Sequence, residues 1–297
     1  MNKLPEKFDY EDTFMGVALD RSEGFEERVY ADDHRLRKLM ELVKEKKGRI
    51  LEAGCGGGSF IESLAHFYPS ATMYGCDISK TAISYAKKFG KGKVTYDVIT
   101  KNKLPYSDGF FDDCVCLDLL EHEPDTDLFL KEIKRILKKD GLFFLAVPCE
   151  GQWGTLTWVY QKIKIGRKLT FKHFGHIHPE FTHKNVCLLL QKYGFRIVKK
   201  SYSMHLLTQI FQLFQYFLPK ELLELIIGAK KAERYYDKSI VRDSSKGSIR
   251  NDLFMKIRIV WFKLSWLTNI ISAIELKLMH NVSFTSWKLL VLAKKTG

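Results

Sequence analysis

A loop rich in glycine follows the first predicted strand, within the segment ILEAGCGGGSF. Its pattern is E-x-G-x-G-x-G, formed by Glu52, Gly54, Gly56 and Gly58. Glycines allow the backbone to approach a ligand closely because no Cβ intervenes. Asp77 ends the next predicted strand, 19 residues after Gly58, where a carboxylate can accept hydrogen bonds from both hydroxyls of a ribose. The spacing therefore predicts a site for a cofactor that contains a ribose.

Two cofactor classes fit such a loop. A dinucleotide fingerprint has Gly or Ala as its third small residue, but this chain has Ser59 there. The carboxylate of Glu52 would repel a pyrophosphate and would suit a cationic ligand. S-adenosylmethionine carries an ammonium and a sulfonium, so Glu52 and Ser59 favour it, whereas Asp77 serves both classes. A glycine turn without any ligand is the third interpretation.

Short apolar runs alternate with amphipathic stretches between residues 49 and 148. This alternation predicts an α/β fold with a mostly parallel, doubly wound sheet, whose ligands bind beyond the carboxyl ends of the strands. Ser59 and Glu62 have the spacing of a capping box for the helix after the glycines. Asp125 or Thr126 can cap the helix that precedes the fifth strand.

The segment LDLLEHEPD after the fourth strand carries candidates for catalysis. Asp118, Glu121 and His122 would face one side of a helical turn. His122 is the first candidate for a general base, because an unperturbed imidazole has a pKa near 6.5. An equally weighted interpretation is that Glu121 and His122 only fix the loop by hydrogen bonds. A third is that the trio binds a divalent cation, although we assign no metal site from the sequence.

A second group of candidates lies in residues 150–178, which are rich in aromatic and basic side chains. His173, His176 and His178 form an H-x-x-H-x-H run there. The segment has no clean periodicity, so we predict a loop on the substrate side. His176 and His178 join His122 as catalytic candidates, with one histidine reaching the substrate and the others orienting the loop. The alternative is that none of them is functional.

Several segments in order resemble class I S-adenosylmethionine-dependent methyltransferases, in the small-molecule branch that includes the ubiquinone-pathway O-methyltransferases. The resemblance covers about residues 49–203 and the closing strand. It implies a seven-stranded sheet of order 3-2-1-4-5-7-6 with the last strand antiparallel. The matching segments are LEAGCGGG, YGCDIS, YDVITKNKLPYSDGFFDDCVCLDLLEHEPD, LKEIKRILKKDGLFFLAVP and HIHPEFTHKNVCLLLQKYGFRIV.

The resemblance also implies S-adenosylmethionine as the cofactor and assigns residues to it. In the family, the acidic residue that matches Asp77 binds the ribose and the step that matches Asp97 and Val98 faces the adenine. The residues that match Asp118 and Leu119 approach the methionyl part. The predicted cofactor-binding residues are Glu52, Gly54, Cys55, Gly56, Asp77, Ile78, Asp97, Val98, Asp118 and Leu119.

Charge is distributed unevenly along the 297 residues, whose formal net charge is +13. Residues 1–150 have a balance of −4 and residues 151–297 a balance of +17. We predict a helical N-terminal cap over 1–48, a methyltransferase domain over 49–203 plus 284–297, and a basic helical insertion over 204–283 between the last two strands. The basic half would attract partners that bear phosphate groups.

The insertion contains two amphipathic stripes with basic flanks. No charge-free run is long and apolar enough to span a bilayer. The stripes fit in-plane attachment to an anionic membrane, or they pack on the domain and on each other. The first twenty residues lack the apolar run of a secretory signal, so we expect a cytoplasmic protein, peripheral on the inner face of the membrane.

The sequence thus predicts an enzyme that transfers a methyl group to a hydrophobic or lipid-linked small molecule, with oxygen as the acceptor atom. One alternative is an RNA methyltransferase that uses the basic half. The segment after the fourth strand lacks the D/N-P-P-Y pattern that would stack a flipped base. This argues against methylation of the exocyclic amine of adenine but not against every RNA substrate, and we do not expect nucleic acid as the partner. The other alternative is a binding module that has kept the fold without catalysis. The oligomeric state is not predicted.

Overall fold

The computed structural model describes residues 25–43, 46–99, 103–162, 175–213, 267–268 and 270–297. Seven strands form one sheet in the order β3-β2-β1-β4-β5-β7-β6. β7 is antiparallel to both of its neighbours, while the remaining pairs are parallel, so the predicted fold class is confirmed. The strands are β1 (Gly48–Ala53), β2 (Ala71–Asp77), β3 (Val94–Val98), β4 (Phe111–Leu117), β5 (Leu137–Pro148), β6 (Phe195–Ser203) and β7 (Lys288–Lys295).

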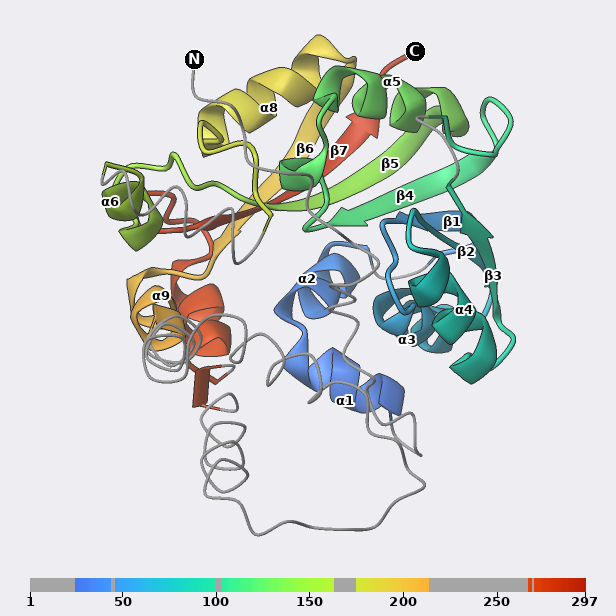
Figure 1. The fold of residues 1–297 in the computed structure, drawn as a ribbon, viewed down its shortest axis with the longest axis horizontal. Coiled ribbons are helices and arrows are strands. Elements are labelled where there is room, and N and C mark those ends of the chain that lie inside the picture. Colours follow the sequence, from blue (N-terminus) through green and yellow to red (C-terminus); the bar gives the residue numbers. More distant parts are fainter. Residues whose placement is uncertain (1–24, 44–45, 100–102, 163–174, 214–266, 269) are drawn as a thin grey trace, which may run out of the picture.

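Helices cover both faces of the sheet (Figure 1). α2, α3 and α4 supply buried side chains to one hydrophobic core, and α5 and α8 supply them to the other. The helices of the described residues are α1 (Phe25–Asp32), α2 (His34–Leu42), α3 (Ser59–Phe67), α4 (Lys80–Phe89), α5 (Thr126–Ile136), α6 (Leu156–Lys162), α8 (His183–Lys192) and α9 (Leu206–Gln212), with the short 3₁₀ turn η1 (Leu120–His122) and a further helix at 270–279.

Local sequence explains why α5 forms where it does. The carboxylate of Asp125 accepts a hydrogen bond from the backbone N–H of Leu128 at 2.8 Å, as a helix N-cap should. Leu130, Ile133 and Ile136 recur at helical spacing and are fully buried against the sheet. The predicted cap at Asp125 is therefore confirmed.

The glycine loop begins α3 in a different way from the one predicted. Gly58 has a φ of +81° and stands at the N-cap without a side-chain hydrogen bond, so Ser59 is already helical. Glu62 is buried and accepts a hydrogen bond from the hydroxyl of Tyr96 at 2.7 Å. The predicted capping box of Ser59 and Glu62 is wrong, because the left-handed glycine starts the helix and Glu62 is used to bind β3.

The strand order brings the carboxyl ends of β1, β2, β3 and β4 to one edge of the sheet. In register, Ala53 of β1 lies between Cys76 of β2 and Cys116 of β4. Asp77 of β2 pairs with Val98 of β3. Residues that follow these strands therefore meet at this edge, although they are distant in sequence.

β6 ends at Ser203 and β7 begins at Lys288, so the predicted insertion lies between these two strands. Within its described part, α9 and the helix at 270–279 are joined by Glu275, whose carboxylate accepts hydrogen bonds from the backbone of Leu207 at 3.0 Å and the hydroxyl of Thr208 at 2.5 Å. The rest of both amphipathic stripes, at 214–266, lies outside the described residues, as do residues 1–24 of the predicted cap. Among the helices that are described, none combines the length and apolar character needed to cross a membrane.

Candidate active site

Asp77 and the glycine loop form one unit at the carboxyl edge. The backbone N–H of Gly56 donates to Oδ2 of Asp77 at 2.8 Å, and that of Ser79 donates to Oδ1 at 2.9 Å. The backbone N–H groups of Gly54 and Cys55 both donate to the carbonyl of Cys76. The loop between β1 and α3 is thus tied to the end of β2, and the two parts of the predicted cofactor site are held in a fixed relation.

Close packing explains why glycines occupy this loop. A Cβ on Gly54 would lie 2.9 Å from the side chain of Leu119, and one on Gly58 would collide with the hydroxyl of Tyr96. Gly56 has a φ of +49° and open space around its Cα. Leu119 follows β4 and reaches the loop after β1, so two of the predicted cofactor residues are in contact.

The predicted adenine side lies at the ends of β2 and β3. Ile78 is 52% exposed, although it is a large apolar side chain at the carboxyl edge. Asp97 accepts a hydrogen bond from the hydroxyl of Tyr106 at 3.0 Å. Val98 pairs with Asp77 across the strands. The structure thus places an exposed apolar side chain and a fixed carboxylate beside the ribose candidate.

Glu52 lies beneath the glycine loop. Its side chain is buried, and its carboxylate accepts a hydrogen bond from the backbone N–H of Ile61 in α3 at 3.1 Å. Burial raises the pKa of Glu52 well above its ordinary range. This carboxyl group therefore also fastens α3 to β1, in addition to any direct role toward a cationic ligand.

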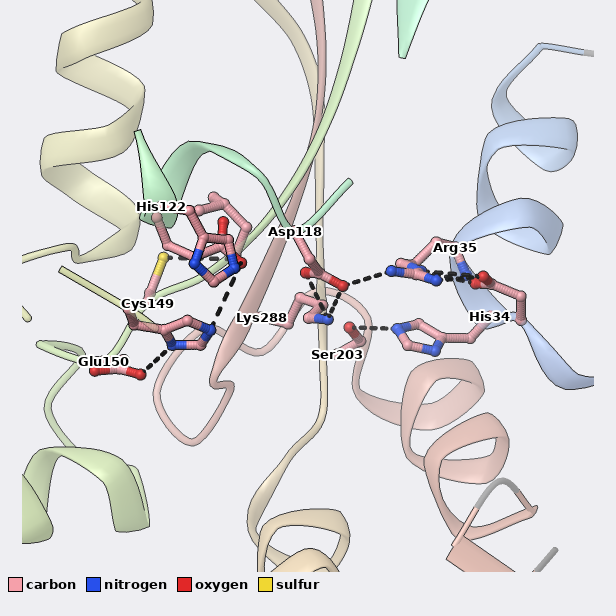
Figure 2. A network of polar contacts seen from close by, with 12 residues as sticks. His34, Arg35, Asp118, His122, Cys149, Glu150, Ser203 and Lys288 are labelled. Atoms are coloured by element: carbon pink, nitrogen blue, oxygen red, sulfur yellow. Dashed lines mark hydrogen bonds and ion pairs between the residues drawn. The ribbon is translucent and has the colours of Figure 1, made fainter. Parts of the chain in front are cut away.

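Asp118 is the centre of a chain of alternating charges (Figure 2). Its carboxylate accepts from Arg35 of α2 at 2.5 Å and from Lys288 of β7 at 2.8 Å. Arg35 is also paired with Asp33. Burial alone would raise the pKa of Asp118, but the charges of Lys288 and Arg35 outweigh it and lower this pKa to about 2.

Asp118, Glu121 and His122 were expected to share one face of a helical turn, but residues 118–122 do not form such a turn. Asp118 has a left-handed φ of +49°, and the following turn at 120–122 is a 3₁₀ turn. Figure 2 shows His122 on one side of Asp118 and Lys288, and His34 and Arg35 on the other side. The predicted one-sided trio is therefore wrong, because the backbone bends at Asp118.

His176 takes the place that the sequence had given to Asp118. Nε2 of His122 and Nε2 of His176 each lie 3.8 Å from Oε1 of Glu121. The two imidazole rings are 5.0 Å apart and meet edge to face. Neither oxygen of the buried Glu121 carboxyl has a hydrogen-bond partner within the described part of the chain.

The partners of the two rings indicate their tautomers. Nδ1 of His122 lies 3.1 Å from the carbonyl of Gly175, and Nδ1 of His176 bonds to the carboxylate of Glu150. Both Nδ1 atoms therefore carry the proton, and both Nε2 atoms present lone pairs toward Glu121. Burial and then the charge of His176 lower the pKa of His122 to about 4, so this ring is neutral at physiological pH.

Glu121, His122 and His176 form a donor set that could hold a metal ion. One ligand atom from each residue lies within 4.8 Å of the others. Burial and then the charge of Asp118 raise the pKa of Glu121 well above its ordinary range, which a bound cation would counteract. Two imidazoles and one carboxylate suit a divalent transition-metal ion, and each imidazole has its other nitrogen fixed by an acceptor, as metal-binding histidines usually do.

His178 lies outside this donor set. Nδ1 bonds to Glu180 at 2.8 Å and Nε2 to the carbonyl of Glu123 at 2.8 Å. Burial would lower the pKa of His178, but these two bonds raise it above the ordinary value. With acceptors at both nitrogens, this ring connects its loop to the end of η1. His173 lies outside the described residues.

Four residues of the site were not singled out in the sequence. Arg35 and Lys288 stand among many basic residues, and their sequence neighbourhood does not distinguish them from surface cations. Glu150 and Gln161 have no motif around them. Their roles depend on contacts with residues that are 11 to 170 positions away, which no local pattern reveals.

Comparisons with known proteins agree with the fold. Residues 51–145 match the family model described as a methyltransferase domain. The ubiquinone biosynthesis O-methyltransferase of Pelagibacter ubique is 36% identical over 117 residues, which are 38% of this chain and 47% of that protein. The same enzyme of Bartonella bacilliformis is 33% identical over 101 residues, which are 33% of this chain and 40% of that protein. The chain therefore matches less than half the length of these relatives.

Solved structures show a similar fold at low sequence identity. Phosphoethanolamine N-methyltransferase 2 of Haemonchus contortus, in complex with S-adenosyl-L-methionine, has a TM-score of 0.54 and 17% identity, over 96% of this chain and 60% of that chain. Geranyl diphosphate C-methyltransferase of Streptomyces coelicolor has a TM-score of 0.54 and 13% identity, over 94% of this chain and 85% of that chain. Residues 51–145 thus form a methyltransferase domain, and the chain has the class I fold, as the resemblance implied.

Proposed function

We propose that this chain is an S-adenosylmethionine-dependent methyltransferase. The observation that carries the proposal is the carboxyl-edge unit in which the glycine loop and the carboxylate of Asp77 are joined by the Gly56 hydrogen bond of 2.8 Å. The match of residues 51–145 to a methyltransferase domain supports it. The residues that we propose to bind the cofactor are Glu52, Gly54, Cys55, Gly56, Asp77, Ile78, Asp97, Val98, Asp118 and Leu119.

We assign Arg35 to the methionyl end of the same cofactor. Its guanidinium lies against Asp118, which follows β4 where the methionyl part is expected. S-adenosylmethionine carries a carboxylate and an ammonium at that end, and an arginine recognises a carboxylate well. Asp33 holds the guanidinium from the other side, with a hydrogen bond of 2.9 Å to Nε, so α2 brings a preoriented cation to the cofactor.

The acceptor that we propose is a hydroxyl group of a hydrophobic or lipid-linked small molecule. Methylation at oxygen requires that the hydroxyl proton leaves, whereas an amine needs no base. A buried carboxyl and two imidazoles lie at the same sheet edge as Asp118. The partial match to ubiquinone biosynthesis O-methyltransferases also favours oxygen.

We propose that Glu121, His122 and His176 act together by holding a divalent cation. The fit rests on two observations: the buried Glu121 oxygens lack hydrogen-bond donors, and both imidazoles present Nε2 lone pairs toward them. When bound, such a cation would act as a Lewis acid that lowers the pKa of an acceptor hydroxyl, so that the hydroxyl proton passes to solvent water. In this proposal His122 and His176 bind the cation, which replaces the general-base role that the sequence suggested for His122 and the substrate contact that it suggested for a loop histidine, and His178 positions the loop.

We further propose that the acceptor is reached at an anionic membrane surface. Exposed apolar side chains gather on α6, on α9 and on the helix at 270–279 with the loop that follows it, and the rings of Trp153 and Phe284 are 4.5 Å apart. Lys162 and Lys277 lie on the same elements. Aromatic and aliphatic side chains beside basic ones suit contact with anionic lipid. The exposed apolar residues are Trp153, Val159, Leu207, Ile274, Leu278, Val282 and Phe284.

Transfer of label tests the function directly. The chain is incubated with S-adenosylmethionine carrying an isotopic methyl group and with separate lipid, RNA and protein extracts. We expect label in the lipid fraction, on an alkali-stable ether oxygen. Label confined to RNA would instead support the alternative based on the basic half, and cofactor binding without label in any fraction would support a binding module.

The membrane part is tested by flotation with vesicles. We expect the chain to bind vesicles that contain about 30% phosphatidylserine, which mimic an anionic membrane leaflet. The variant L278E should bind these vesicles more weakly. The variant L188E is the control, because Leu188 is also exposed but lies on α8, which is not part of the proposed membrane surface. Equal binding by both variants and the original chain would reject the proposed surface.

A further inference from the structure

Glu150 is a buried acidic residue outside the segment that matches the methyltransferase domain. It follows the end of β5 by two residues and is 2% exposed. Leaving a carboxylate unpaired in such a place costs several kcal/mol, so its partners must compensate. Figure 2 shows Glu150 on the same side of Asp118 as His122.

Both oxygens of the Glu150 carboxylate have defined partners. Oε1 bonds to Nδ1 of His176, and Oε2 accepts a hydrogen bond from Nε2 of Gln161 in α6 at 2.8 Å. Gln161 is itself buried. The amide therefore fixes the plane of the carboxylate, and the carboxylate in turn fixes the imidazole.

The bond to Nδ1 determines what the other nitrogen of His176 can do. With the proton held at Nδ1, Nε2 has a lone pair, and this atom lies 3.8 Å from Oε1 of Glu121. The ring of His122 lies 5.0 Å away. If Nδ1 lost its acceptor, the imidazole would be free to rotate or to exchange tautomers, and Nε2 would no longer be kept unprotonated toward the donor set.

We propose that Glu150 is a positioning residue, which together with Gln161 holds His176 in the orientation and tautomer that direct Nε2 to Glu121 and His122. The inference rests on the proposed cation site, since holding a lone pair toward a carboxylate has a purpose only when a cation binds between them. A carboxylate behind a metal-binding imidazole typically contributes 10- to 100-fold to metal affinity.

A neighbouring pair offers a matched comparison. His178 and Glu180 form the same kind of contact, with Nδ1 at 2.8 Å from the carboxylate. The side chain of Glu180 is 61% exposed, however, and Nε2 of His178 is bonded to a backbone carbonyl instead of facing Glu121. Both histidines lie on the loop that precedes α8, so removing the charge of Glu180 controls for a general disturbance of this loop.

The experiment measures Mn²⁺ binding by calorimetry in the full chain and its variants, with S-adenosylmethionine affinity as the test of correct folding. We expect E150L to weaken Mn²⁺ binding 10- to 100-fold. E150Q keeps an acceptor for Nδ1 of His176 when the Gln161 amide turns its oxygen toward the new N–H₂ group, but it removes the negative charge behind the imidazole, so it should lose roughly tenfold. E180Q should bind Mn²⁺ within about twofold of the original chain, and all variants should bind S-adenosylmethionine equally.

The second readout needs no metal. Long-range ¹H–¹⁵N spectra of the metal-free chain report which ring nitrogen of His176 carries the proton. We expect the Nδ1–H tautomer in the original chain and in E180Q, and a mixture in E150L.

Wild-type Mn²⁺ affinity in E150Q, or an unchanged tautomer in E150L, would overturn the role of Glu150. If E150L does not fold, the affinity and tautomer of E150Q decide. If the original chain fails to bind Mn²⁺, the cation site is rejected, and the spectra still show whether Glu150 sets the tautomer.

Discussion

The two halves of the carboxyl edge are constructed differently. The half around Asp77 uses backbone hydrogen bonds within residues 52–98, and its main contact joins positions 21 residues apart. The half around Glu121 is assembled from side chains on α2, η1, β7 and the loops after β5 and before α8. A backbone-built site can be encoded by a short motif, whereas a side-chain site of this kind depends on the packing of the whole chain.

The halves also differ in where their charges lie. Asp77 is hydrogen-bonded to backbone amides, which stabilise a carboxylate without a countercharge. Around Asp118, the cations of Arg35 and Lys288 neutralise the charge of the partly buried carboxylate. We call the part around Asp77 the backbone half and the part around Asp118 and Glu121 the side-chain half. We expect the activity of the side-chain half to be sensitive to single substitutions that remove a charge, and the backbone half to be sensitive to substitutions of its glycines.

The largest expected effect is on catalysis and arises in the side-chain half. E121Q should lower kcat about a thousandfold, because loss of the carboxylate ligand removes several kcal/mol of stabilisation of the reacting oxygen. Affinity for S-adenosylmethionine, measured by calorimetry, should stay within twofold. A comparable loss of cofactor affinity would show that the two halves are one site.

Removal of divalent cations is expected to have a similar effect without any substitution. Dialysis against EDTA should lower the rate of methyl transfer at least a hundredfold, and added Mn²⁺ should restore it. Binding of S-adenosylmethionine to the dialysed chain should remain, since the cofactor residues lie in the other half. Full activity after dialysis would contradict the proposed cation site.

The next effect concerns cofactor affinity. D77A should raise the Kd for S-adenosylmethionine about a hundredfold, which corresponds to two charged hydrogen bonds. At saturating cofactor, kcat should change only a few-fold. An unchanged Kd in calorimetry would reject the assignment of Asp77 to the ribose.

Two glycine substitutions in the backbone half distinguish the cost of a left-handed backbone conformation from the cost of a steric clash. G56A introduces a Cβ at a left-handed φ in open space, and it should cost about 1 kcal/mol of unfolding free energy. G58A combines a φ of +81° with a collision with Tyr96, so it should cost at least about 2 kcal/mol. Denaturant unfolding of both variants measures the difference, and equal costs would show that Tyr96 moves freely.

The smallest effect is on the pH dependence of stability. Burial lowers the pKa of His34, which contacts Ser203, to about 3. As the pH falls, His34 therefore takes up a proton in the unfolded chain at a higher pH than in the folded chain. The free energy of unfolding should decrease below about pH 6.5, by roughly 1 kcal/mol between pH 6.5 and 5.5. H34Q should remove this part of the dependence in unfolding experiments at several pH values.

Much of the fold followed from the sequence because its signals are local and periodic. The alternation between residues 49 and 148, together with the family resemblance, predicted the strand order that the structure confirms. The glycine pattern and Asp77 were placed together correctly, because both follow adjacent parallel strands. The capping box failed because the same spacing of Ser and Glu is compatible with a buried Glu62 that binds Tyr96.

The side-chain half was predicted only in part. Glu121 and His122 were found together from their motif, and His176 from its histidine run, but the association of His176 with the other two was not predicted. The expected helical turn placed Asp118 with Glu121, whereas a left-handed residue turned it toward Arg35 and Lys288. A single backbone dihedral cannot be read from a pattern of side chains, and it decided the composition of this site.

The family resemblance supplied the strand order, while the residues by themselves determined the alternation of strands and helices, the loop chemistry at residues 52–58 and the kind of ligand that this loop suits. These features depend on near neighbours in the chain and on the periodicity of buried side chains. Only the tertiary structure decided that His176 completes the donor set, that Glu150 stands behind it and that α2 brings Arg35 to Asp118. Those contacts join segments that are up to 170 residues apart, and chain packing alone brings such segments together.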